Sequence, residues 1–460
     1  MPKSKHYAIW AMAMVMVIIL IAFAMRTSQL NDYPPSTSTD EATNALDSFR
    51  FGLLWNLPLY EDIGRPEPLY RIILGVGSAL FSPRVWSVRF TTALLGVLSI
   101  AAAFRAGVAI TTGQRKVVRL GAGLVAAGIL TVAMGHLTVS RSIYRAILQP
   151  LFTLLYISAL FEGLEKQRKQ YFIVAGILLA IATHTYTSAL LLPLSLPIVG
   201  LNLFVFQRAR WRQWLPNLLL TGIIAGILLL PVAILIVQQP DVMLGRVQDV
   251  TDTQTSFGRR IQLFLMQFYY MGDENPQYNV ANAPMLPPIF NLIFTAGLLS
   301  IVWHFRKVAS WLIGGLFILA AIPVLLSNEV THGLRMFGEF VPIALTAAIG
   351  YEVLIVIGMR IWQQRRYLYK VGLVAIFGIT VIFSGITWQQ YRNYWEKPEE
   401  WRLLTGYGGV QLTHNEWFFR TFRRTFAEWV IAQDAPLLMP VASMERMTTR
   451  TWLFSAYPEV

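Results

Sequence analysis

The sequence predicts an all-α polytopic membrane protein with about eleven transmembrane helices. Apolar runs long enough to cross a bilayer repeat along most of the 460-residue chain. Only 14% of the residues are charged, and the mean hydropathy is +0.51. A helix needs about 20 apolar residues to cross the hydrocarbon core, whereas soluble domains carry about a quarter charged residues. The composition therefore indicates that most of the chain lies in lipid.

Composition also excludes several classes of site. The chain has no cysteine, which removes disulfides, iron–sulfur clusters and cysteine zinc sites. The net charge is +13, from 38 Lys and Arg against 25 Asp and Glu. In a membrane protein such an excess reflects basic cytoplasmic loops. We expect no nucleic-acid partner, because no basic soluble domain is present to hold the charge.

The predicted spans follow the apolar runs, and the connections between them are polar. The spans are 7–25, 88–110, 120–137, 146–161, 171–185, 187–206, 215–237, 286–304, 310–326, 338–359 and 371–387. The polar cluster Thr183–Ser188 divides the fifth from the sixth, because the whole stretch is too long for one helix. A small-residue cleavage site, Ala22–Ala24, is compatible with a signal peptide, but the length of the first run favours an uncleaved span.

The basic residues predict the orientation of these spans. Every second connection is short and rich in Lys or Arg, which places it in the cytoplasm together with the N-terminus. The alternate connections, 26–87, 138–145, 238–285 and 327–337, then lie outside. The transmembrane domain is thus 1–387. The extracytoplasmic tail 388–460 contains a possible helix at 416–433 and a strand at 437–441, as in a small or shortened α/β unit.

One short apolar stretch lies within the first outer connection. Leu69–Phe81 is too short to span the membrane easily, and a crossing there would break the alternation of basic loops. We expect an interfacial helix at the outer surface.

Arginines are unusually frequent in the outer connections, against the orientation rule. Most are explained by ion pairs or by contact with lipid head groups. Arginine also offers a planar set of donors that suits phosphate oxygens. Two clusters near outer helix ends are candidates for phosphate binding. Arg141 and Arg145 are four residues apart, and His332 and Arg335 are three apart, so each pair would share a helix face.

The first outer connection also holds an acidic pair, Asp40 and Glu41. A carboxylate at the membrane surface could deprotonate an acceptor hydroxyl or amine. The alternative is helix capping, because Ser38 or Thr39 followed by two acids suits the first turn of a helix. Taken alone, the pattern favours capping.

Metal ligation has little support in the sequence. No His-x-x-x-His pair occurs, although His136, His184 and His332 all fall near the predicted outer face. A divalent cation held by these residues with Glu41 or Glu67 stays open, and helix-packing hydrogen bonds are the simpler expectation. We predict no other cofactor.

The order of these motifs resembles the GT-C superfamily, in particular the branch of protein O-mannosyltransferases and bacterial aminoarabinose transferases. A first span leads to an outer Asp-Glu motif, here Asp40-Glu41, and then to a Pro-Pro-Leu-Tyr-like element, here Pro66–Tyr70. An apolar-Arg element (Val85–Phe90) enters the next span, and the second outer connection begins with Ser140-Arg141.

The resemblance implies a function. It assigns Asp40 as the catalytic base, with Glu41 ordering the acceptor or assisting a cation. The donor would be a sugar on a polyprenyl phosphate, whose phosphate is already a good leaving group. Candidates for binding that phosphate are Arg65, Arg141, Arg145, His332 and Arg335. Attack opposite the leaving phosphate would invert the anomeric centre.

The chain also departs from the family pattern. Relatives often carry Arg-Pro-Asp in the second outer connection, whereas this sequence has Tyr144-Arg145-Ala146. The missing carboxylate argues against a two-acid arrangement and against metal dependence.

The resemblance places the enzyme in the plasma or inner membrane, with its site on the non-cytoplasmic side. The acceptor would be a protein, lipid or glycan. Three alternatives stay open: a transporter or flippase of a lipid-linked or anionic substrate, a non-catalytic envelope scaffold, and a glycan polymerase or ligase. A transporter would favour charged or broken helices at mid-membrane depth, and such charges are scarce here.

Overall fold

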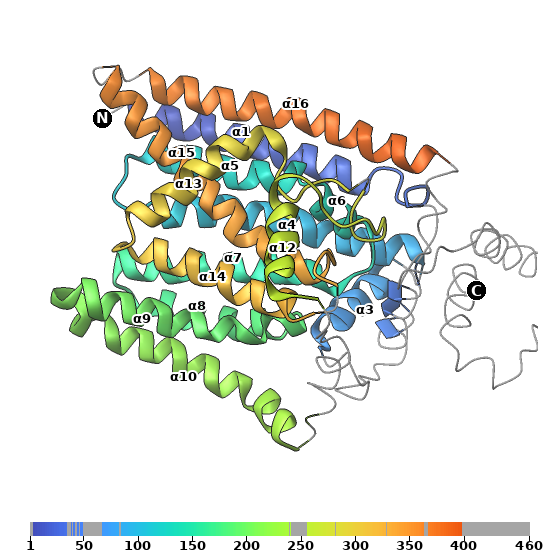
Figure 1. The fold of residues 1–460 in the computed structure, drawn as a ribbon, viewed down its shortest axis with the longest axis horizontal. Helices are drawn as coiled ribbons and strands as arrows, with labels where there is room; N and C mark the ends of the chain where they lie inside the picture. The colour runs from blue at the N-terminus through green and yellow to red at the C-terminus, as the bar shows by residue number, and fades with distance from the viewer. Residues whose placement is uncertain are drawn as a thin grey trace, which may run out of the picture.

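A computed structural model describes residues 3–34, 38, 40–41, 44–45, 47–48, 67–81, 84–238, 240, 255–280, 282–327, 329–362 and 367–397. This part of the chain consists of helices and the turns that connect them, as expected. Figure 1 shows a bundle of long, roughly parallel helices, with the N-terminus at one end and the short helices α3 and α6 toward the other.

The helices follow one another in the order of the predicted spans. Their bounds are α1 Lys3–Thr27, α3 Leu69–Phe81, α4 Val85–Ile110, α5 Lys116–Val132, α6 Met134–Arg141, η1 Arg145–Ile147, α7 Leu148–Lys166, α8 Lys169–Thr183, η2 Thr187–Leu194, α9 Ser195–Phe206, α10 Arg208–Gln238, α12 Phe257–Tyr269, η3 Pro288–Phe290, α13 Asn291–Trp303, α14 Val308–Leu325, η4 Arg335–Glu339, α15 Phe340–Ile361 and α16 Leu368–Glu396.

The multi-span helical fold is confirmed. Among the described residues, eight helices are long and apolar enough to cross a membrane, or nine if the bent pair α5–α6 forms one span. Two further predicted spans fall on shorter apolar helices, Lys169–Thr183 and Pro288–Trp303. The exact count of eleven therefore stays a prediction.

The centre of the bundle is built from small residues that let two helices touch. A Cβ added at Gly107 of α4 would lie 2.9 Å from the carbonyl oxygen of Ala122 on α5, and one at Gly123 would lie 2.7 Å from the carbonyl oxygen of Phe104. Close backbone approach of this kind is how helices associate in lipid, where apolar burial provides no driving force. This close contact sets the position of α4 relative to α5.

The predicted span 120–137 is broken in the structure. Helix α5 ends at Val132, α6 begins at Met134, and the two axes differ by 62°. The buried Arg26 of α1 lies at the break: its Nη2 donates to the carbonyl of Leu130 at 2.8 Å and lies 3.1 Å from Nδ1 of His136. The guanidinium thus satisfies a carbonyl that the interrupted helix leaves without an intrahelical partner.

Two other boundaries test the predictions. The chain does break at the polar cluster, since α8 ends at Thr183 and η2 begins at Thr187, and the short helix Leu69–Phe81 has the predicted bounds. The last helix, however, continues to Glu396 and not to 387, because its final turns are packed: Tyr391 and Trp395 are fully buried beside Met25 and Leu137. The predicted tail helix 416–433 and strand 437–441 lie outside the described residues.

Candidate functional site

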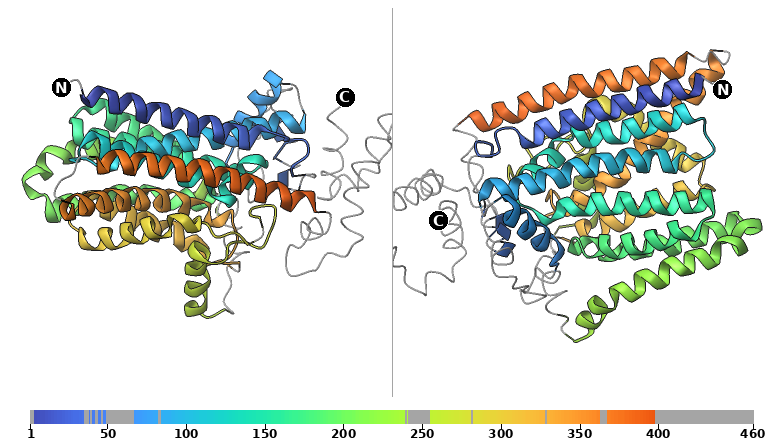
Figure 2. Two further views of the ribbon diagram at one scale, coloured as in Figure 1. Left: turned by 90° about the horizontal axis from the view of Figure 1, so that it is seen from above. Right: turned by 180° about the vertical axis from the view of Figure 1, so that it is seen from behind.

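The predicted site residues that the structure describes gather at one end of the bundle. Figure 2 shows α3 and the C-terminal ends of α1 and α16 at this end, with the N-terminus at the opposite end. Four connections meet here: the one after α1, the one between α6 and η1, the one between α12 and η3, and the one before η4. The basic-loop argument predicts that this end is the outer one.

The first turn after α1 contains a capping box. The backbone N–H of Ser38 donates to Oε2 of Glu41 at 2.9 Å, and the backbone N–H of Glu41 donates to Oγ of Ser38 at 3.2 Å. These are the two reciprocal bonds of a Ser-x-x-Glu cap. The capping interpretation of the acidic pair is therefore confirmed for Ser38 and Glu41.

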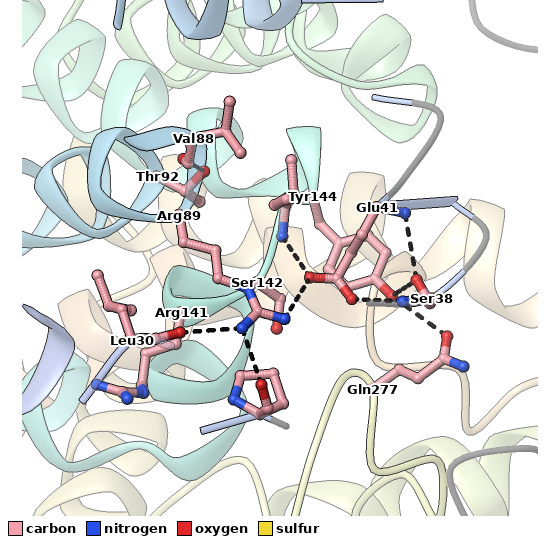
Figure 3. Close-up of polar contacts among 12 residues, drawn as sticks. Leu30, Ser38, Glu41, Val88, Arg89, Thr92, Arg141, Ser142, Tyr144 and Gln277 are labelled. Atoms are coloured by element: carbon pink, nitrogen blue, oxygen red, sulfur yellow. Dashed lines mark hydrogen bonds and ion pairs between the residues drawn. The ribbon is translucent and has the colours of Figure 1, made fainter. Parts of the chain in front are cut away.

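Glu41 also joins this turn to two other elements. Its Oε1 accepts the backbone N–H of Ile143 at 3.0 Å and lies 3.8 Å from Nη2 of Arg89. Nη1 of Arg89 in turn donates to the carbonyls of Leu30 and Pro34, at 3.0 and 2.8 Å. Figure 3 shows the carboxylate between Ser38, Arg89 and the backbone next to Tyr144. Because the Glu41 side chain is buried and both its oxygens are engaged, it is placed to hold the first and second outer connections together.

Asp40 differs from its neighbour in exposure. It is half-buried on the same helical turn, whereas Glu41 is buried. Asp40 lies near Tyr144. Burial, Glu41, Tyr278 and Asp40 together raise the pKa of the Tyr144 hydroxyl well above its ordinary value. The hydroxyl therefore stays neutral and can donate a hydrogen bond beside Asp40.

Tyr144 links the acidic turn to a third connection that the sequence did not single out. Its hydroxyl lies 2.7 Å from Oγ of Ser38 and donates to Oε1 of Gln277 at 3.2 Å. The Tyr144 ring packs edge-on against Tyr278 at 5.2 Å, and Tyr278 stacks on His332 at 4.7 Å. This aromatic row brings His332 into the same neighbourhood as Asp40. The signal for Gln277 and Tyr278 was the polar run Gly272–Asn279 within an otherwise apolar half of the chain.

Asp273 fixes that third connection to the fourth. Its carboxylate accepts the backbone N–H groups of Asn275 and Gly333. Burial raises its pKa to about 7, with smaller contributions from Glu329 and Glu274, although the two backbone donors act in the opposite direction. Asp273 is thus a buried acid that positions the turn carrying His332 and Arg335.

His332 and Arg335 share a helical turn, as their spacing predicts. The backbone N–H of Arg335 donates to the carbonyl of His332 at 3.0 Å, at the start of η4. His332 is buried, whereas Arg335 is partly exposed, with Nη1 3.4 Å from the carbonyl of Glu329.

Arg145 lies in a separate polar cluster beside α3. Its Nε is 3.3 Å from Oε2 of Glu67, and its guanidinium lies 5.4 Å from the ring of Tyr186. The other oxygen of Glu67 accepts the hydroxyl of Thr187 at 2.7 Å. Arg145 therefore lies where three segments meet: the start of α7, the approach to α3 and the break before η2.

Arg141 does not share a face with Arg145, so the expectation of a common helix face is wrong. Helix α6 ends at Arg141, and Ser142 and Tyr144 have extended backbones, which turns Arg145 away. The fully buried Arg141 donates instead to the carbonyls of Met25, Ser28 and Tyr33, at 2.7, 2.8 and 2.9 Å. The guanidinium also lies over the rings of Trp388 and Tyr391. It caps the C-terminal end of α1 and connects it to α16.

The remaining predictions concern Arg65 and the histidines considered as metal ligands. Arg65 lies outside the described residues. Among the residues that the structure describes, no group of three His, Asp or Glu side chains is arranged to hold a metal ion. His136 contacts Arg26 and stacks on Phe337, and His184 lies 3.5 Å from the carbonyl of Leu228.

Comparison with known proteins supports the resemblance. Residues 65–235 match the family model of dolichyl-phosphate-mannose-protein mannosyltransferases. ArnT from Cupriavidus metallidurans, solved with bound undecaprenyl phosphate, superposes with a TM-score of 0.58 at 13% identity, covering 98% of this chain and 85% of ArnT. The archaeal oligosaccharyltransferase AglB from Archaeoglobus fulgidus, solved with an inhibitory peptide and a dolichol-phosphate, gives 0.50 at 13% identity, covering 87% of this chain and 60% of AglB. Comparison with curated protein sequences gives no match.

Both structural relatives share little sequence with this chain, so they establish its fold and not its substrate. The family model covers the segment from the approach to α3 through α10, which includes Glu67, Arg141 and Arg145. The chain therefore has the fold of the GT-C glycosyltransferases, and its resemblance to the protein O-mannosyltransferase and aminoarabinose transferase branch is confirmed.

Proposed function

We propose that the protein is an inverting glycosyltransferase that moves a hexosyl or pentosyl group from a polyprenyl phosphate to an acceptor at the outer face of the membrane. The observation that carries the proposal is the contrast between two adjacent carboxylates. Glu41 is buried and accepts backbone N–H groups from two connections, at Ser38 and Ile143; we call this pair of hydrogen bonds the Glu41 bracket. Asp40, in contrast, is partly exposed and lies near the neutral hydroxyl of Tyr144. One carboxylate fixes the turn, and we assign the other, which is the more exposed of the two, to the acceptor.

Asp40 is the proposed general base. A base must be held firmly and must be reachable by the proton that it takes. The capping box fixes the backbone at Glu41, one residue away, and so helps to fix the position of Asp40. Glu41 is a positioning residue in this account.

The proposed phosphate site uses cations that are partly exposed at the same end. Arg145, beside α3, and Arg335, at the start of η4, meet this condition, and His332 lies on the same turn as Arg335 and stacks on Tyr278. Arg65 stays in the set as a candidate. We leave Arg141 out, because its donors are directed at the carbonyls that end α1. Fixed cations at this level would stabilise the charge that grows on the leaving phosphate.

The reaction then needs no general acid. The glycosidic C–O bond breaks with its electron pair going to the polyprenyl phosphate oxygen, and the acceptor oxygen or nitrogen attacks the opposite face of the oxocarbenium-like centre. The acceptor proton passes to Asp40. The products are the inverted glycoside and the free polyprenyl phosphate, with no redox change.

The fold supports this assignment of class. ArnT, which has the fold of this chain, was solved with undecaprenyl phosphate, and AglB was solved with a dolichol-phosphate. We infer a polyprenyl-phosphate donor from these two relatives and an outer-face site from the basic-loop orientation.

The test is sugar transfer in proteoliposomes supplied with a pool of polyprenyl-phosphate sugars and with protein, lipid and glycan acceptors. The released polyprenyl phosphate is measured directly, so the acceptor need not be known beforehand. Wild type should release carrier, and Arg335→Gln should need a higher donor concentration for half-maximal release. Arg259→Gln, an exposed arginine on α12, is the matched control and should behave as wild type. Carrier release from no donor would contradict the proposal.

A further inference from the structure

A groove lies outside the candidate active site, along the C-terminal half of α16. This groove has a volume of about 530 Å³ and opens between the α5–α6 break, the connection before η3 and the face of α16. Its walls away from α16 are apolar. They are formed by Val132, Met134, Val280, Ala283, Pro284, Pro287 and Pro288.

The α16 side of the groove changes character along the helix. The lining residues recur at spacings of three and four, which places them on one helix face. In chain order they are Phe383, Ile386, Thr387, Gln390, Asn393, Tyr394 and Lys397. The face therefore begins apolar, continues with amide side chains and ends with an ammonium group at the outer end of the helix.

The length of this face matches one leaflet of a bilayer. Phe383 and Lys397 are 14 residues apart, which corresponds to ~21 Å along a helix. Half of a bilayer that measures roughly 40–45 Å across, head groups included, has the same thickness. A groove of this length would run from the mid-plane to the head-group level.

The lining of the groove includes a positive charge, Lys397, at the C-terminal end of α16. Lys397 is exposed and lines it, and it is the one lysine of the sequence that falls on the predicted outer side. The neighbouring acid, Glu396, is engaged elsewhere: it accepts Nη2 of Arg392 at 2.6 Å and the hydroxyl of Tyr33 at 3.2 Å. The charges of Glu396 and Arg392 offset one another, so among the described residues the groove lining ends on the positive charge of Lys397.

We propose that this groove binds an anionic phospholipid of the outer leaflet. An acyl chain would lie against Phe383 and Ile386, and the phosphate would lie at Lys397. The amides of Gln390 and Asn393 lie between these levels, where a phospholipid has its ester carbonyls. A polyprenyl phosphate carries no acyl ester there, which is why a phospholipid fits this sequence of side chains better.

Such a lipid would also contact a connection that belongs to the candidate active site. The connection that forms one wall of the groove at Val280 and Ala283 is the connection that carries Gln277 and Tyr278 a few residues earlier. A bound lipid would therefore restrict the motion of the segment that contacts Tyr144.

The proposal is tested by native mass spectrometry of the delipidated full-length protein. Phosphatidylglycerol and phosphatidylcholine with the same acyl chains are titrated separately, and undecaprenyl phosphate is then added as a competitor. We expect phosphatidylglycerol adducts to exceed phosphatidylcholine adducts. Lys397→Gln should weaken phosphatidylglycerol binding about fivefold, the effect of one basic residue near a lipid surface. Ile386→Trp should fill the groove and weaken binding of both lipids.

Two variants outside the groove lining serve as controls. Arg259→Gln removes one positive charge at an exposed position of α12, and Ile382→Trp adds the same bulk at a 63% exposed position of α16. Both should bind phosphatidylglycerol as wild type does. Equal binding of the two phospholipids, or equal losses in Lys397→Gln and Arg259→Gln, would overturn the proposal. Displacement of phosphatidylglycerol by a lower concentration of undecaprenyl phosphate would show that the groove is a carrier site instead.

Discussion

At the scale of single residues, two neighbouring carboxylates have different surroundings. Glu41 accepts the backbone N–H groups of Ser38 and Ile143, at 2.9 and 3.0 Å, through different oxygens. A carboxylate can accept both at once, whereas a carboxamide has a single acceptor oxygen. These two hydrogen bonds therefore require both carboxylate oxygens of Glu41.

Glu41→Gln tests this positioning role. The amide NH₂ would face one of the two backbone donors, leaving a buried N–H without an acceptor, at a cost of about 1–3 kcal/mol. We expect a lower free energy of unfolding in a denaturant titration, together with reduced transfer. Glu274→Gln, an exposed acid in another outer connection, should change the unfolding free energy by less than about 0.5 kcal/mol. Unchanged stability in Glu41→Gln would show that the bracket is not needed.

Local sequence rules predicted the cap but not the wider site. A Ser-x-x-Glu pattern is a property of four residues, so Ser38 and Glu41 could be paired from sequence alone. Tyr144, Gln277 and Tyr278 meet only because three distant connections fold onto one another. Arg141 and Arg145 do not share the helix face that was expected, because the helix ends between them. The sequence gives no sign of this end, since no proline or glycine lies between the two arginines.

At the scale of helices, two buried arginines close helix ends that belong to other segments. Arg26 of α1 donates to the carbonyl of Leu130 at the end of α5, and Arg141 of α6 donates to the carbonyls of Met25 and Ser28 at the end of α1. In lipid such carbonyls find no water, so each needs a protein donor. The break at Ala133 could not be predicted, because the donor that compensates for it comes from a helix more than 100 residues away.

Arg141→Lys should reveal how much this cap stabilises the bundle. Lysine keeps the charge but cannot direct a planar set of donors at several carbonyls. We expect a loss of at least about 2 kcal/mol in the free energy of unfolding. The exposed Arg259→Lys should lose almost none. An equal effect in the two variants would contradict the capping role.

The connection between α12 and η3 should make stability depend on pH. Burial raises the pKa of Asp273 from 3.8 to about 7, so folding favours the neutral acid. Its contribution to stability is complete below the ordinary pKa and is lost as the pH rises through 7. Thermal unfolding from pH 4 to 8 should therefore show a larger decline for wild type than for Asp273→Asn, which cannot ionise. Parallel curves would rule out Asp273 as the source.

At the scale of the whole molecule, the basic connections predict which end of the bundle faces the cytoplasm. Most of the helices, including α3, could be predicted from apolar run lengths, because hydrophobic thickness constrains every span in the same way. The extension of α16 to Glu396 could not, since its last turns are polar and aromatic and are held by contacts with α1 and α6.

The absence of cysteine makes the orientation directly measurable. Single cysteines at Ser256 and Gln170, both exposed, would lie at opposite ends of the bundle by the predicted topology. A membrane-impermeant maleimide should label Ser256→Cys in intact cells, and should label Gln170→Cys only after permeabilisation. The reverse pattern would place the candidate site in the cytoplasm.

The central claim is that Asp40 takes the proton from the acceptor. The most direct measurement is single-turnover sugar transfer by wild type and Asp40→Asn in proteoliposomes, with polyprenyl-phosphate binding measured in parallel. The account predicts that transfer falls by about 10²- to 10⁴-fold while carrier binding is retained. Transfer at the wild-type rate in Asp40→Asn would contradict it.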